Sequence, residues 1–69
     1  MPAETPLEMA RRHLARCEEL IAAQVALVER LRRHNHPTLD AEELLSALRQ
    51  TLVVTRDHLA IEEQRAAGL

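Results

Sequence analysis

Apolar residues recur along this chain at the three- and four-residue spacing of an α-helix, in two separate segments. In each segment the spacing forms a heptad repeat, whose first and fourth positions (a and d) are mostly apolar. In the first segment these positions are Leu7, Leu14, Ile21 and Val28 at a, and Ala10, Cys17, Gln24 and Leu31 at d. In the second segment they are Leu45, Leu52, Leu59 and Ala66 at a, and Ala41, Leu48, Thr55 and Glu62 at d. The pattern predicts two amphipathic helices, over about residues 6–34 and 38–67.

The residues at the start of the first segment are typical of a helix N-terminus. Thr5 can cap the helix, Pro6 suits its first position, and Glu8 can complete a capping box. We therefore expect residues 1–4 to be a disordered lead and residues 5–69 to form a single helical domain.

A turn over residues 35–37 separates the two segments. Asn35 tolerates the left-handed backbone conformation that ends many helices, and Pro37 stops a helix from continuing. Thr38 is a candidate cap for the second helix, and Gly68 marks its end. A connection this short joins antiparallel neighbours, so the predicted fold class is all-α, an antiparallel two-helix hairpin.

Charged residues at the e positions suggest a register for the hairpin. We expect a positions of one helix to face a positions of the other, and d positions to face d positions. The residue numbers of such facing pairs then sum to 72 or 73, and those of facing e positions sum to 74. Three such pairs have opposite charges: Arg11 with Glu63, Glu18 with Arg56, and Arg32 with Glu42. Exposed pairs stabilise little, so their expected role is to select the register.

A second apolar stripe occupies the g and c positions on the other side of both helices. A lone hairpin would leave this stripe in water, whereas a two-fold dimer would bury it and form a four-helix bundle. The residues predicted to form this dimer interface are Met9, His13, Leu20, Ala23, Leu27, Leu44, Ala47, Thr51, Val54, His58 and Ile61.

The composition also favours association. The chain has 69 residues and no aromatic residue, so a monomeric core would be marginal. Cys17 is the only cysteine, which excludes an internal disulfide and fits a reducing cytoplasm. Neither a signal peptide nor a membrane-spanning segment is indicated by the sequence.

A few residues could carry chemistry, and each has a simpler structural interpretation. Gln24 and Thr55 are best read as polar core residues that fix register, and Cys17 as a small buried hydrophobe. His13 and His58 are expected near each other across the hairpin, either as a zinc or pH-sensitive site or as two partly solvated histidines. No motif for catalysis, metal binding or a cofactor is present, so we expect neither enzymatic activity nor a bound cofactor.

The basic residues are all arginines, and several cluster at the start of the first helix and near the turn. The net charge of −2 gives no overall field that would attract nucleic acid. Most of these arginines are expected to lie on solvated helix faces. The candidate nucleic-acid contacts are Arg11, Arg12, Arg16, Arg30 and Arg33.

The turn and the second helix also show a familiar pattern, formed by Asn35-His36-Pro37-Thr38, Ala41, Leu44-Leu45, Leu48 and Thr51-Leu52. This pattern resembles a set of short, uncharacterised bacterial proteins with an Arg- and His-rich first helix. In those proteins the turn typically reads Gly-His-Asp-Thr, so this chain departs from it at Asn35 and Pro37. The resemblance implies the same hairpin fold and no assigned activity.

Together these features predict a small cytoplasmic interaction or regulatory module that acts as a homodimer, with an unknown protein partner. The alternative is a dimer that binds nucleic acid through its arginine clusters.

Overall fold

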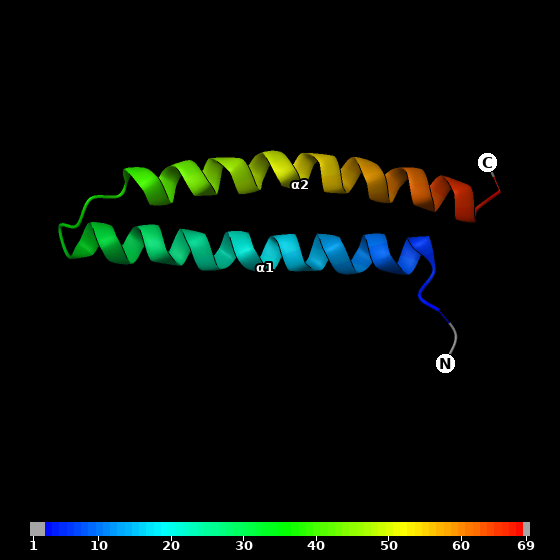
Figure 1. Ribbon diagram of the computed structural model, residues 1–69, viewed down its shortest axis with the longest axis horizontal. Helices are drawn as coiled ribbons and strands as arrows, with labels where there is room; N and C mark the ends of the chain where they lie inside the picture. Colours follow the sequence, from blue (N-terminus) through cyan, green and yellow to red (C-terminus); the bar gives the residue numbers. More distant parts are fainter. Residues whose placement is uncertain (1–2, 69) are drawn as a thin grey trace.

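The protein is an antiparallel pair of long α-helices, α1 (Pro6–Arg33) and α2 (Leu39–Ala66), in a computed structural model that describes residues 3–68. Both helices have 28 residues and lie side by side, with the start of α1 near the end of α2 and the turn at the opposite end (Figure 1). The described residues contain no strand. The predicted all-α hairpin is confirmed, and the helix bounds differ from the expected ones by a residue.

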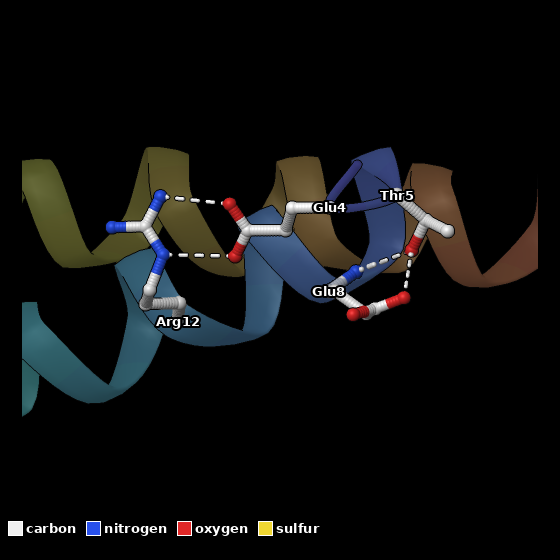
Figure 2. Close-up of polar contacts among 4 residues, drawn as sticks. All are labelled: Glu4, Thr5, Glu8 and Arg12. Carbon is white, nitrogen blue, oxygen red and sulfur yellow. Dashed lines mark hydrogen bonds and ion pairs between the residues drawn. The ribbon is translucent and has the colours of Figure 1, made fainter. Parts of the chain in front are cut away.

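The start of α1 follows the predicted cap with one difference. The Thr5 hydroxyl oxygen accepts a hydrogen bond from the Glu8 backbone N–H at 3.1 Å, and Pro6 is the first helical residue. The Glu8 carboxylate does not close a capping box on the Thr5 backbone; it accepts a hydrogen bond from the Thr5 hydroxyl at 3.0 Å (Figure 2). Of the four residues expected to be a disordered lead, Met1 and Pro2 lie outside the described residues.

The turn is set by the backbone of Asn35, which has a positive φ of 57°. The His36 N–H donates to the Leu31 carbonyl at 2.9 Å, and the Asn35 N–H donates to the Arg32 carbonyl at 3.2 Å. This pair of bonds is a Schellman motif, which satisfies carbonyl groups at the end of α1. The predicted left-handed conformation of Asn35 is therefore confirmed.

The predicted cap of α2 is wrong. The Thr38 backbone is already near-helical, with φ −115° and ψ −5°, and its side chain makes no capping bond. Its hydroxyl instead donates to the Glu42 carboxylate at 3.2 Å. At the far end of α2, Gly68 follows the last helical residues as expected, with a positive φ of 77°, and its N–H donates to the Arg65 carbonyl at 3.1 Å.

The core is a single seam between the helices. From Leu7 to Glu62, every a and d residue assigned from the sequence is buried or half-buried, whereas Ala66 at the end is exposed. No large side chain among the described residues is fully buried. The reason is that the molecule is a single layer of helices, 52 × 26 × 13 Å, with nothing packed on its two faces.

The register differs from the expected one by about half a heptad. The Cys17 thiol donates to the Leu48 carbonyl at 3.8 Å, and the Gln24 amide donates to the Ala41 carbonyl at 2.9 Å. The expected partners, from a sum of 72, were Thr55 for Cys17 and Leu48 for Gln24, so each observed partner lies one heptad before the expected one in the sequence. Because Cys17 also lines a groove together with Thr55, it lies between Leu48 and Thr55 instead of level with its expected partner.

Only one of the three predicted e pairs forms. Arg32 donates to the Glu42 carboxylate at 2.6 Å. The other two predicted pairs, Arg11 with Glu63 and Glu18 with Arg56, form no ion pair within the described chain, so those predictions are wrong. A shift of half a heptad moves such partners about 5 Å apart along the helix axis.

Candidate interaction surface

The g and c residues predicted as a dimer interface lie on both helices, and we call their surface the apolar flank. It comprises Met9, His13, Leu20, Ala23, Leu27, Leu44, Ala47, Thr51, Val54, His58 and Ile61. All of them are exposed except Leu27, which is half-buried.

The apolar flank holds most of the large hydrophobic side chains that remain in water. Seven large hydrophobic residues among those described are exposed, and five of them belong to the flank: Met9, Leu20, Leu44, Val54 and Ile61. Their exposed fractions run from 39% to 68%. The other two are Leu39, at the start of α2, and Val53, beside the flank. A concentration of this kind on one side of a small protein is characteristic of a contact surface.

A groove of about 310 Å³ interrupts the flank near the middle of both helices. Its walls are formed by His13, Arg16, Cys17, Leu20, Leu48, Thr51 and Thr55. Cys17 is buried, as expected for a small core residue, and its thiol donates a hydrogen bond to the Leu48 carbonyl. The groove was not predicted from the sequence, although the three small side chains of Cys17, Thr51 and Thr55 are a signal for unfilled space.

A buried carboxylate near the chain ends occupies a d position assigned from the sequence, although its contact with Arg65 was not predicted. Glu62 has only 6% of its surface exposed, yet its Oε1 accepts a hydrogen bond from Arg65 Nη1 at 2.9 Å. The Nε2 of His58 lies 3.4 Å from the same oxygen. Both partners come from α2 itself, three residues after and four residues before Glu62, which is a spacing that brings helical side chains together. The spacing of these three residues in the sequence could therefore have predicted both contacts.

The two histidines considered as a pair have different neighbours. His13 lines the groove, whereas His58 lies against the Glu62 carboxylate. Across residues 3–68, no group of three or more His, Cys, Asp and Glu side chains is arranged to hold a metal ion.

Two of the five candidate nucleic-acid arginines are engaged by carboxylates. Arg12 donates to both carboxylate oxygens of Glu4, at 2.8 and 3.0 Å (Figure 2), and Arg16 lies 3.4 Å from Glu19. The hydrogen bond from Arg12 lowers the pKa of the Glu4 carboxyl below its ordinary value of 4.5.

The remaining three candidates, Arg11, Arg30 and Arg33, make no ion pair with the described residues. They lie at the two ends of α1, about 30 Å apart along a straight helix. One hairpin therefore carries two separate basic sites instead of a continuous basic patch.

Comparison with family models, curated proteins and solved structures found no match to this chain. The resemblance of the turn and second helix to short bacterial proteins therefore stays an expectation. Within the described residues, neither helix combines the length and apolar character needed to cross a membrane.

Proposed function

We propose that this protein is a small cytoplasmic interaction or regulatory module that acts as a homodimer, in which two hairpins pack by their apolar flanks into a four-helix bundle. The observation that carries the proposal is the apolar flank itself, with Leu44 and Val54 more than half exposed. A second copy presents the same stripe, so a two-fold axis would cover both stripes at once.

The surface area of the hairpin supports a second copy as the occupant. A compact monomer of 7.8 kDa would expose about 4,400 Å², from the usual scaling of surface with mass. This chain exposes 5408 Å². The excess of about 1,000 Å² is close to the ~800 Å² that each partner buries in a standard interface. A second layer of helices would also cover one face of the 13 Å layer.

Two neighbouring valines provide a matched test of this surface. Val54 belongs to the flank and is 68% exposed, whereas Val53 is 59% exposed and lies outside it. Val54→Glu should raise the dissociation constant of the dimer about tenfold or more, because it buries a carboxylate without a partner. Val53→Glu should leave it nearly unchanged. Sedimentation equilibrium over a range of concentrations measures both; the reverse ranking would place the interface on another face.

The second candidate function is nucleic-acid binding by the same dimer. It is favoured by Arg11, Arg30 and Arg33, whose guanidinium groups are left unpaired by the described chain. Binding through phosphates would weaken steeply with salt, because each contact releases counterions. A titration of labelled RNA or DNA at two salt concentrations tests this alternative, with Arg30→Ala/Arg33→Ala as the variant and Arg12→Ala as its control. Absence of binding at low salt would eliminate it.

A further inference from the structure

We propose that the groove between α1 and α2 binds a small amphipathic anion, a carboxylate with a medium-length alkyl chain. The groove has a volume of about 310 Å³, and Leu20 of α1 and Leu48 of α2 give it aliphatic walls. This volume lies at the lower end of the range found for small-molecule sites. The wall belongs to one hairpin, so the inference goes beyond the proposed homodimer and does not depend on it.

Three polar side chains of the wall already use their hydrogens inside the hairpin. The Cys17 thiol donates to the Leu48 carbonyl at 3.8 Å. The Thr51 hydroxyl donates to the Ala47 carbonyl at 3.1 Å, and the Thr55 hydroxyl donates to the Thr51 carbonyl at 2.8 Å. Each thiol or hydroxyl has a single hydrogen, so none of the three is free to donate to a ligand. This part of the wall therefore suits an alkyl chain, whose removal from water favours binding.

Donors for an anion come from one edge of the groove. His13 and Arg16 line this edge from α1, and both are exposed, at a spacing that places helical side chains on the same face. A guanidinium group presents several N–H donors in a planar fork that matches a carboxylate. None of the described residues that line the groove is acidic. An alkyl carboxylate thus fits both parts of the wall, with its chain between Leu20 and Leu48 and its head group at Arg16.

The carboxylates of Glu4 and Glu19 also act on this edge. Glu4 is held by Arg12, which donates to both of its oxygens at 2.8 and 3.0 Å. Glu19 lies 3.4 Å from Arg16 Nη1, in a pair whose side chains are 67% and 69% exposed. An exposed pair of this kind stabilises little. A ligand in the groove also buries its alkyl chain, so it would compete with Glu19 for Arg16 on favourable terms.

An NMR titration of the isotope-labelled full-length chain with octanoate tests the proposal. Saturable shifts should be centred on Cys17, Leu20, Leu48 and Thr51, with a dissociation constant of about 1 mM for a ligand of this size. Octanol has the chain without the charge and should bind about threefold to tenfold more weakly. Acetate has the charge without the chain and should give no saturable shift at the same concentration.

Two substitutions at the edge of the groove should act in opposite directions. Arg16→Gln should weaken octanoate binding about threefold to tenfold and leave octanol binding unchanged, because only the charged contact is lost. Glu19→Gln should strengthen octanoate binding about twofold to threefold, because it removes the competitor for Arg16. Arg33→Gln makes the same change of charge as Arg16→Gln at the far end of α1 and should leave octanoate binding unchanged.

A third substitution tests the cavity itself. Thr51→Leu fills the groove from an exposed position of α2 and should abolish the binding of both octanoate and octanol. Ala23→Leu adds an apolar side chain to the apolar flank outside the groove wall and should leave binding unchanged. Circular dichroism checks the helicity of each variant, and the gain expected for Glu19→Gln cannot arise from unfolding.

The possible results separate the site from the proposed homodimer. Absence of saturable shifts up to about 10 mM octanoate would overturn the site. Equal binding of octanoate and octanol, with shifts that spread to Leu44 and Val54, would also overturn it, because it would indicate adsorption along the whole apolar flank. The mass is measured on the same samples: binding to a chain that stays at 7.8 kDa would support the site and contradict the homodimer, whereas a dimer without binding would do the reverse.

Discussion

The carboxylate of Glu62 occupies a core position of α2, where it accepts a hydrogen bond at 2.9 Å from Arg65. The Arg65 side chain is 71% exposed, so the pair links the seam to the solvent at the end of the hairpin. A carboxylate in this position loses hydration that an exposed arginine only partly replaces.

Glu62→Leu should therefore raise the stability of the protein, by about 1 kcal/mol, because it replaces a buried charge with an apolar side chain at a d position. Arg65→Ala should lower the stability by about 1 kcal/mol, since Glu62 would keep only His58 as a neighbour. Urea denaturation at one fixed protein concentration measures both. A loss of stability in Glu62→Leu would mean that the ion pair stabilises the fold.

The contact between Glu4 and Arg12 predicts a specific pH response. Because Arg12 lowers the pKa of Glu4, the contact stabilises the start of α1 above the ordinary carboxyl pKa of 4.5, and this contribution is lost as the pH falls through the lowered value. An NMR titration should show the Glu4 pKa rising when Arg12 is replaced by alanine. Arg16→Ala is the control and should leave the Glu4 titration unchanged, because Arg16 contacts Glu19. Equal effects of both variants would argue against the contact.

The turn provides a test of backbone strain. Asn35 has a φ of 57°, a conformation that costs glycine little and most other residues more. Asn35→Gly should leave the stability equal or slightly higher, whereas Asn35→Val should lower it by about 1–2 kcal/mol. Thermal denaturation followed by circular dichroism measures the difference. Similar melting temperatures for the two variants would contradict the left-handed turn.

Two adjacent leucines separate the seam from the apolar flank. Leu45 is 8% exposed at an a position, whereas Leu44 is 52% exposed on the flank. Leu45→Ala should cost about 2–5 kcal/mol and lower the helicity at every protein concentration. Leu44→Ala should weaken the dimer first, so its helicity should recover as concentration rises. Identical concentration dependence in the two variants would show that Leu44 is not at an interface.

The heptad repeat was sufficient to predict the two helices and the seam, because burial on one side of a helix requires apolar residues at that spacing. Asn35 and Gly68 could be assigned for a similar reason, since few residues accept a positive φ. Predictions of this kind depend only on residues that are close in the sequence, so they do not require knowledge of how the partner helix packs.

The details that depend on contact between the helices were not predictable in the same way. Cys17 lies between two d residues of α2, and this interleaving depends on the three-dimensional packing of side chains of different sizes. A competing local contact was also not predicted: the Thr38 hydroxyl donates to the Glu42 carboxylate of the same helix and does not cap a backbone N–H. The groove beside Cys17 is likewise a consequence of packing, since it forms only where small residues from both helices meet.

The mass of the folded wild-type chain in solution tests the proposed homodimer most directly. Sedimentation equilibrium at micromolar concentration, with helicity checked on the same samples, should give about twice the chain mass of 7.8 kDa, falling toward the monomer mass on dilution together with the helicity. A mass of 7.8 kDa for a chain that remains fully helical at every concentration would contradict it.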